Sequence, residues 1–445
     1  MGTESGAEPG TAISQDQAEG HIHGVCFKTG PPGSAGVELE WLVMDRAEPR
    51  RPVPMERLDA VLEPLTGHAA RNGGRPGSGL PCGTVLTREP GGQLELSTPP
   101  AAGAVACVAG AATDLEVVRR TLHEDGLHLL GYGLEPFRDP PRVLDHPRYA
   151  AMEAYLDRIG PWGRMMMRAT AAVQVNLDAG TDGDGIDGYR ARWQLVHRLG
   201  PVLVAAFANS PLWQGRPTGW RSTRQAVWER LDPSRTRPPQ GREANGDPAA
   251  AFARSALGAG LLCLRRNPPA DWTAPPGHSF ASWLDGGVTE RRPTIGDLDY
   301  HLSTLFPPVR PRGWLEMRMI DAQPGDGWMV PALLATVLMD DPRAAEAAWA
   351  ATEPLCPNGS PYPPQAVWSR AARLGPGAPE LAKAALDCFA AADTALSGPD
   401  VPAPMRRAVS SFAERYTERG RCPADDLLDD RDGACRPDRL EGTSR

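Results

Sequence analysis

Four short segments of the sequence alternate between apolar and polar side chains, which is the pattern of β-strands with one buried face. In the first segment, a row of apolar residues from Val37 to Val43 faces away from Glu38 and Glu40. The four segments are 37-VELEWLV-43, 93-QLELS-97, 169-ATAAVQVNLD-178 and 314-WLEMRMI-320. The alternation favours antiparallel strands that each cover a core with one face and present polar groups on the other.

The polar faces of these strands have an unusual chemistry. Solvent-facing strand positions commonly carry Lys, Thr, Ser and Arg, whereas these carry mainly Glu, Gln and Asn. For any single strand, a solvated face is the simpler explanation. If the four strands share a sheet, however, several glutamates converge on one surface: Glu38, Glu40, Glu95 and Glu316, joined by Glu89. Packed carboxylates raise one another's pKa unless cations neutralise them, and Mg²⁺ takes carboxylate oxygens while leaving sites for phosphate. The pattern therefore predicts a site for a metal-bound nucleotide.

Length and composition set the class of protein. The chain has 445 residues, of which 41% are hydrophobic and 23% charged, as in soluble globular proteins with one large core or two ordinary ones. The formal charge of −8 comes without a basic stripe, so we expect no nucleic-acid partner. The longest apolar runs, 202–208 and 258–264, are too short to span a bilayer, so no membrane association is expected.

Cysteine usage and the N-terminal segment indicate the compartment. The first 20 residues lack a basic start followed by an apolar core, so they do not resemble a signal peptide. The eight cysteines have no CxxC spacing, which predicts reduced thiols in the cytoplasm and argues against zinc.

We predict a polar segment at each end of the chain and a single domain between them. Residues 1–20 are expected to be a disordered lead-in, and 421–445 a polar C-terminal tail. Between them, 21–420 contain loop-like interruptions at 67–81 and 266–278, and the stretch 266–292 is either a lid or an insertion. Helical periodicity covers roughly 104–130, 188–208, 248–264, 329–350, 378–396 and 402–418.

The segment 209–238 is rich in arginine and tryptophan. Arginine offers a fork of donors that matches carboxylate and phosphate oxygens, although a solvated surface loop is the simpler explanation for most of these side chains. Arg224 opens a short helical pattern, and helix N-termini favour anions, so Arg224 is the first candidate for a ligand contact and Arg235 the second. No GxxxxGK[ST] or GxGxxG motif occurs, so a nucleotide would be held through metals and arginines.

In order along the chain, five segments resemble the bacterial and plant-type glutamate–cysteine ligases, and within them the actinobacterial EgtA type of ergothioneine biosynthesis. The segments are 36-GVELEWLV-43, 89-EPGGQLELST-98, 170-TAAVQVNLD-178, 209-NSPLWQGRPTGWRSTRQAVW-228 and 314-WLEMRMIDAQP-324. The resemblance implies an α+β, glutamine-synthetase-like catalytic fold, in which a curved and mainly antiparallel sheet forms a funnel backed by helices. It also implies that 21–420 form a single ATP-dependent carboxylate–amine ligase domain.

The implied activity joins the γ-carboxylate of L-glutamate to the amine of L-cysteine, using ATP and more than one Mg²⁺ ion, through a γ-glutamyl phosphate. Such chemistry depends on positioning and charge neutralisation, so no nucleophilic side chain is required. The resemblance assigns the metal ligands to Glu38, Glu40, Glu89, Glu95 and Glu316. For Glu89, which precedes the turn Pro90-Gly91-Gly92, simple exposure at that turn carries more weight as an alternative than it does for the other four glutamates.

The remaining polar residues are expected to hold the substrates. Glu38, Glu316 and Arg318 are the expected catalytic residues, and Arg318 should face the phosphates. The other ATP contacts expected are Gln174, Asn176 and Arg224, and the other substrate contacts are Gln93, Thr170, Arg224 and Arg235. Gln174 stands where more distant relatives have a histidine, so it is assigned no metal.

Three other functions compete with this interpretation. One is an ATP-dependent ligase that joins glutamate to a different amine, and another is a guanidino kinase, which uses a related sheet. The third is a nucleotide-binding pseudoenzyme, which the presence of glutamate at all five expected metal positions disfavours. The sequence leaves open how cysteine is recognised and how many chains assemble.

Overall fold

The computed structural model describes residues 10–66, 79–239, 246–267 and 269–430, and it is built around one antiparallel sheet. The sheet has the strand order β2-β3-β1-β6-β10-β9, with β4 and β5 also paired to β1. These strands are β1 (Ser34–Asp45), β2 (Val85–Arg88), β3 (Leu94–Ser97), β4 (Ala101–Ala102), β5 (Leu127–Leu130), β6 (Ala172–Asp178), β9 (Val309–Pro311) and β10 (Trp314–Asp321). A separate hairpin is formed by β7 (Leu212–Trp213) and β8 (Arg216–Pro217).

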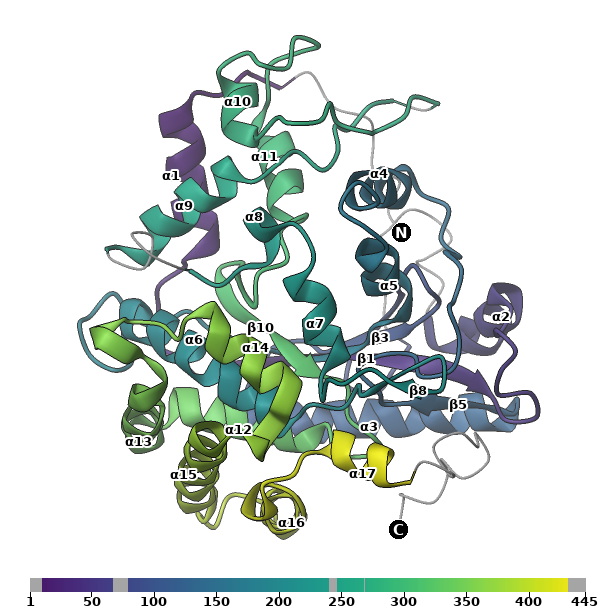
Figure 1. Ribbon diagram of the computed structural model, residues 1–445, viewed down its shortest axis with the longest axis vertical. Coiled ribbons are helices and arrows are strands. Elements are labelled where there is room, and N and C mark those ends of the chain that lie inside the picture. Colours follow the sequence, from purple (N-terminus) through teal and green to yellow (C-terminus); the bar gives the residue numbers. More distant parts are fainter. Residues whose placement is uncertain (1–9, 67–78, 240–245, 268, 431–445) are drawn as a thin grey trace.

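Helices lie on both sides of this sheet (Figure 1). On the apolar side, α3 (Gly103–Glu124), α6 (Tyr189–Ala206) and α12 (Met329–Asp340) contact the strands. Beyond them lie α13 (Pro342–Thr352), α14 (Gln365–Leu374), α15 (Pro379–Leu396), α16 (Ala403–Arg415) and α17 (Pro423–Asp429).

The polar side is framed by shorter helices drawn in the upper half of Figure 1. They are α1 (Gln15–Cys26), α4 (Pro147–Leu156), α5 (Trp162–Ala169), α7 (Thr223–Glu229), α8 (Pro233–Thr236), α9 (Pro248–Gly258), α10 (Phe280–Leu284) and α11 (Ile295–Leu302). Helix α2 (Met55–Thr66) lies beside β2 at the edge of the sheet.

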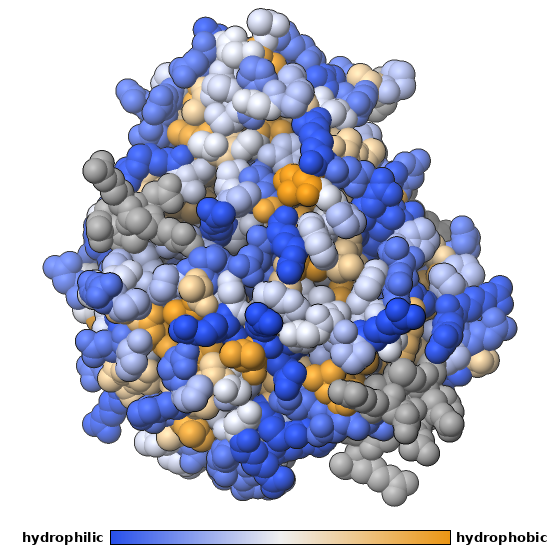
Figure 2. Space-filling view, viewed as in Figure 1, coloured by the Kyte–Doolittle hydropathy of each residue, from blue (hydrophilic) through white to orange (hydrophobic). Residues whose placement is uncertain are grey.

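Alternation along the strands decides which face is buried. Val37, Leu39 and Trp41 are each no more than 2% exposed, and they join a cluster of buried side chains that runs from Ala18 to Tyr416. On the viewed surface, hydrophobic residues form small scattered groups among hydrophilic ones (Figure 2). Within the described ranges, no helix combines the length and apolar composition needed to cross a bilayer.

The four predicted strands are confirmed, as are helices within each of the six predicted helical stretches. The stretch 104–130 contains α3 and β5, and 329–350 contains α12 and most of α13, because Pro342 begins a new helix after the cap residue Asp341. The hairpin turn at Pro90-Gly91-Gly92 is also present, with the Gly92 amide donating to the Glu89 carbonyl at 2.9 Å.

Two terminal stretches differ from expectation. Residues 15–20, assigned to a disordered lead-in, belong to α1, which begins with a capping box between Ser14 and Gln17. Residues 423–429, assigned to the polar tail, form α17. Much of each predicted end, 1–9 and 431–445, lies outside the described residues.

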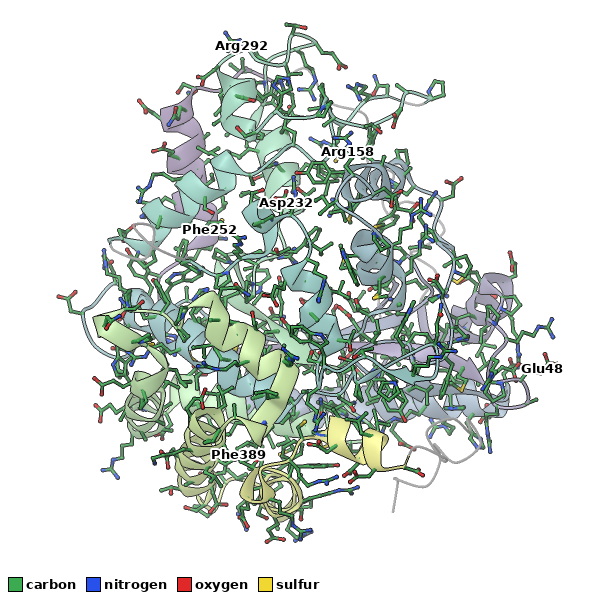
Figure 3. The ribbon with its side chains drawn as sticks, viewed as in Figure 1. Glu48, Arg158, Asp232, Phe252, Arg292 and Phe389 are labelled. Atoms are coloured by element: carbon green, nitrogen blue, oxygen red, sulfur yellow. The ribbon has the colours of Figure 1, made fainter. Side chains whose placement is uncertain are left out.

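The stretch 266–292 lies at one end of the longest axis of the molecule, with α10 and Arg292 at the top of the view (Figure 1, Figure 3). Internal contacts hold the stretch together, namely the ion pair between Arg266 and Glu290, at 2.7 Å, and the Trp272 indole, which donates to the Arg266 carbonyl. The Leu261 amide attaches it to the segment after α9 by donating to the His278 carbonyl at 2.7 Å.

Candidate active site

Strand register brings the predicted carboxylates together. Glu40 on β1 lies directly opposite Glu95 on β3, and Glu38 lies opposite Gln174 on β6. Because directly opposed residues of antiparallel strands share a face, these side chains must point to the same side of the sheet. Asn176, two residues after Gln174 on β6, lies opposite Glu316 on β10.

Amide side chains on the central strand β6 orient the two glutamates of β1. Gln174 Nε2 donates to Glu40 Oε1 at 2.7 Å, and Asn176 Nδ2 donates to Glu38 Oε1 at 3.0 Å. In each case one carboxylate oxygen is held by a neutral donor. These neutral donors fix the direction of the side chains, and the charge of Arg318 acts on both carboxylates from nearby.

The β2–β3 hairpin supplies the next carboxylates. Glu95 Oε1 accepts from Thr87 Oγ1 at 2.8 Å and from Ser97 Oγ at 3.1 Å. The turn between the strands is pressed against the carbonyl of Arg168, and a Cβ at Gly91 would lie 1.9 Å from that oxygen. Only glycine fits this approach, which carries Glu89 to the edge of the polar face.

Burial and mutual repulsion raise the pKa of this carboxylate group. The pKa of Glu38 rises to about 7, first because of burial and then because of the charges of Glu316 and Glu95. Burial is also the largest cause of the raised pKa of Glu40 and Glu95, and it raises the pKa of Glu89 well above its usual value. These are the side chains that a multivalent cation would stabilise in the ionised form.

Glu316 is buried as well, but it is surrounded by arginines. Its oxygens accept from Arg310 Nη2 at 2.7 Å and from Arg312 Nη1 at 3.3 Å, and Arg318 Nη1 also donates to it. Burial would raise the pKa of Glu316, yet the charges of Arg310, Arg318 and Arg312 outweigh it and hold the pKa at about 2.

A β-bulge in β10 connects this strand to α7. The register with β6 shifts between Met317 and Ile320, so the carbonyls inside the bulge are available to other donors. The Arg318 carbonyl accepts from Arg224 Nη2, and the Met319 carbonyl accepts from Gln225 Nε2, both at 2.8 Å. The first turn of α7 is thereby fixed against the strand that carries Arg318.

Arg224 is only 2% exposed, and its guanidinium lies over the ring of Trp228, 4.6 Å from the centroid. Its Nη1 lies 3.8 Å from Asp321 Oδ1, and its Nε has no hydrogen-bond partner in the described part of the chain. Asp321 is itself held by the hydroxyls of Ser210, at 2.7 Å, and Ser222, at 3.0 Å. Arg224 therefore keeps unused donor capacity in a buried position.

These side chains line a cavity of about 480 Å³, a volume in the usual range for small-molecule sites. Nine of the predicted site residues form part of its wall: Glu38, Glu40, Glu89, Gln93, Glu95, Thr170, Gln174, Arg224 and Arg318. Asn176 and Glu316 lie behind that wall, in contact with the lining residues Glu38 and Arg318 respectively. None of the described residues of 266–292 lines the cavity.

Arg235 is the predicted site residue that the structure separates from the others. It lies on α8, where its Nη1 donates to the Thr304 carbonyl at 2.8 Å and its Nη2 donates to the Gly260 carbonyl. It lines a second cavity, which shares the ring of Phe252 with the first (Figure 3). Its guanidinium joins the backbone carbonyls of two separate segments, so the geometry gives Arg235 a structural role.

Several lining residues were missed by the sequence analysis: Arg148, Tyr149, Met152, Met166, Arg310 and Arg312. Arg310 and Arg312 alternate along VRPR, directly before the predicted strand 314–320, and that alternation was a usable signal. Arg148 had no comparable signal, because its place depends on α4 packing beside α11, where it donates to Ser303 Oγ at 2.9 Å.

The donor set fits a nucleotide held with hard cations, since carboxylate oxygens gather beside the guanidiniums of Arg318 and Arg224. Among the described residues, no three carboxyl, imidazole or thiol side chains are already arranged as a metal site. At Glu316, whose oxygens already accept from Arg310, Arg312 and Arg318, a cation would have to displace a guanidinium.

The architecture is a glutamine-synthetase-like fold, in which a polar sheet face forms the floor of a small-molecule cavity. A solved structure shares the fold: the bifunctional glutathione synthetase from Pasteurella multocida superposes with a TM-score of 0.50 at 15% identity, covering 96% of this chain and 52% of that longer one. The predicted fold class is thus confirmed.

The chain belongs to the glutamate-cysteine ligase family 2 (GCS2), whose model matches residues 34–440, and is accordingly a ligase. It is 39% identical over 430 residues to "Glutamate--cysteine ligase EgtA" of Mycolicibacterium smegmatis, covering 95% of this chain and 93% of that protein. It is 40% identical over 410 residues to the protein of the same name from Mycobacterium tuberculosis, covering 91% and 87%. A chloroplastic glutamate--cysteine ligase of Arabidopsis thaliana is 32% identical over 266 residues, covering 58% of this chain and 49% of that protein. The predicted resemblance is confirmed.

Proposed function

We propose that this protein is a glutamate–cysteine ligase that uses ATP to join the γ-carboxylate of L-glutamate to the amine of L-cysteine. The observation that carries the proposal is that four glutamates of raised pKa share one cavity with Arg224 and Arg318. The GCS2 family and the names of the mycobacterial relatives support the choice of substrates.

The reaction proceeds in two steps. A γ-carboxylate oxygen of glutamate attacks the terminal phosphorus of ATP, which forms γ-glutamyl phosphate and releases ADP. The cysteine nitrogen then attacks the γ-carbonyl carbon, the carbon–oxygen bond to phosphate breaks, and the amine loses a proton as the amide forms. Neither step needs a nucleophilic side chain of the protein, so its residues act by positioning and by charge.

In our proposal, Arg318 binds the phosphate oxygens during this reaction. Its guanidinium lies between Glu316 and Gln174, whose Oε1 accepts from it at 2.6 Å, and it faces the cavity next to Glu38. Arg224 has free donor capacity on the same wall and binds a carboxylate or phosphate oxygen. Gln93 and Thr170 position glutamate on the hairpin side, where Gln93 Nε2 donates to the Thr170 carbonyl at 2.8 Å.

Mg²⁺, when bound, neutralises phosphate oxygens as the phosphoryl group transfers. The residues that would hold it are Glu38, Glu40, Glu89 and Glu95, with Glu316 joining after it releases a guanidinium. Their buried oxygens have the hard-donor chemistry that this ion prefers. A cytoplasmic location and a place in ergothioneine biosynthesis, which the resemblance implies, belong to the same proposal.

The test is to incubate the protein with ATP, Mg²⁺ and L-glutamate, then compare L-cysteine with a panel of other amines. We expect ADP release and a γ-glutamylcysteine mass with cysteine alone. If another amine supports turnover and cysteine does not, the rival ligase is correct; phosphoryl transfer to a guanidine without amide formation would identify a kinase.

A variant series separates the enzyme from a nucleotide-binding pseudoenzyme. Glu38→Gln should abolish turnover while the protein stays folded, whereas Glu346→Gln, on the exposed face of α13, should not change it. Unchanged turnover in Glu38→Gln would remove that residue from the site.

A further inference from the structure

Trp314 is one of four large hydrophobic residues that are exposed within the described ranges, with 38% of its surface accessible. It begins β10 and alternates with Glu316 and Arg318, so it lies on the polar face of the sheet. An indole that is exposed beside the site offers an aromatic face on which a planar ligand group can stack.

The orientation of this indole is fixed by two groups of the site. Its Nε1 donates to Asn176 Oδ1 at 3.0 Å, and Asn176 in turn donates to Glu38. The guanidinium carbon of Arg312 lies 5.4 Å from the ring centroid, while Arg312 also donates to Glu316. The ring is therefore held in one position by the same residues that hold the carboxylates.

Trp314 is not itself a lining residue of the cavity, but residues that contact it or adjoin it are. Arg312 and Pro311 line the cavity, together with Val25 and Cys26 of α1. The turn after Arg312 is attached to α1, since the Gly313 amide donates to the Cys26 carbonyl at 2.8 Å. Near the start of β10 the lining therefore combines apolar side chains with a guanidinium.

We propose that Trp314, with Arg312, is the platform on which the adenine base of ATP stacks, an inference that rests on the proposed function. Along a strand, the four steps from Trp314 to Arg318 span about 13 Å, so a triphosphate held at Arg318 can place its base at Trp314. The amino-acid substrates then occupy the part of the cavity that is lined by Tyr149 and Met166.

The test compares two ligands that differ only in whether a base is present. Binding of ATP and of inorganic tripolyphosphate, each with Mg²⁺, is measured by calorimetry for the wild type, Trp314→Phe and Trp314→Ala. Loss of base–aromatic stacking should weaken ATP binding about tenfold in Trp314→Ala and change tripolyphosphate binding less than about twofold. Trp314→Phe, which stacks but cannot donate to Asn176, should bind ATP nearly as well as the wild type.

Leu374→Ala, which removes another exposed hydrophobic side chain, serves as the control and should leave both affinities unchanged. Equal weakening of both ligands in Trp314→Ala, or no weakening of ATP, would overturn the inference while leaving the ligase proposal intact. A wild type that binds neither ligand would overturn both.

Photolabelling of the wild type provides a test that does not depend on a variant folding. Irradiation with 8-azido-ATP should label the tryptic peptide from Gly313 to Arg318, and excess ATP should prevent the labelling. Labelling confined to other peptides would place the base elsewhere.

Discussion

Glu38 is half-buried and Glu316 fully buried on the same sheet face, and their pKa values shift in opposite directions. Burial, followed by the charges of Glu316 and Glu95, raises the pKa of Glu38 to about 7, whereas three arginines outweigh burial and hold the pKa of Glu316 at about 2. At neutral pH the face therefore contains one fixed anion and a group of carboxylates that take up protons easily. Sequence alternation places both residues on this face, but only the packed neighbours determine their charge.

The raised pKa of Glu38 predicts a pH-dependent stability in metal-free protein. Between its usual value of 4.5 and about 7, the folded state keeps a proton that the unfolded state releases, so stability falls as pH rises through this window and is level above it. The contribution amounts to about 3 kcal/mol. Thermal unfolding from pH 4.5 to 8 should show a shallower decline in Glu38→Gln than in the wild type; parallel curves would refute the shift.

Asp321→Asn should destabilise the protein by about 3 kcal/mol, because the substitution leaves the buried guanidinium of Arg224 without its carboxylate partner. The matched control is Asp326→Asn, since Asp326 is 66% exposed in its ion pair with Arg119 and should contribute less than about 1 kcal/mol. Chemical denaturation of both variants measures the difference. Equal effects would show that Asp321 does not stabilise Arg224.

At the scale of elements, alternation identified all four strands of the polar face, because its period reports directly which side chains share a side. The period does not reveal where two elements touch. The bulge that frees the carbonyls of Arg318 and Met319 is the contact point of α7, and neither the bulge nor the contact has a signature in the sequence. Arg235 shows this limit of sequence patterns. Its guanidinium has the same donors as that of Arg224, but they bind the backbone carbonyls of Thr304 and Gly260.

The β2–β3 hairpin gives a sharp prediction at this scale. Gly91→Ala would place a Cβ 1.9 Å from the Arg168 carbonyl, so the turn must shift, with a loss of about 1–3 kcal/mol of stability and displacement of Glu89. Gly110→Ala, within α3 and with its nearest contact at 3.6 Å, should instead stabilise by about 0.5–1 kcal/mol. Urea unfolding of the two variants should give opposite signs; a neutral Gly91→Ala would mean that the turn has room.

At the scale of the whole molecule, the prediction of a polar C-terminal tail is wrong for 423–429, which form α17. Composition shows how many charged residues a segment has, but not which of them are paired. Asp426 accepts from Arg415 at 2.7 Å, from Tyr416 at 2.8 Å and from Arg421 at 3.0 Å, so a charge-rich stretch that reads as a solvated tail is in fact held in place. Local composition cannot report such pairing, since α16 must first pack to present Arg415 and Tyr416 to α17.

Helix α17 is attached to the segment that leads into α7, and this yields a prediction for the entire chain. The Ala424 amide donates to the Ala208 carbonyl at 2.9 Å, and Asp425 Oδ1 lies 2.7 Å from Arg221 Nε, next to the residue that caps α7. A chain ending at residue 420 should lose these contacts, unfold several degrees lower and show weaker ligase activity through the displaced Arg224. A chain ending at 430 keeps all of them and should match the full-length protein. Differential scanning calorimetry and ADP release measure both outcomes, and equal unfolding temperatures for the two shortened chains would show that α17 is dispensable.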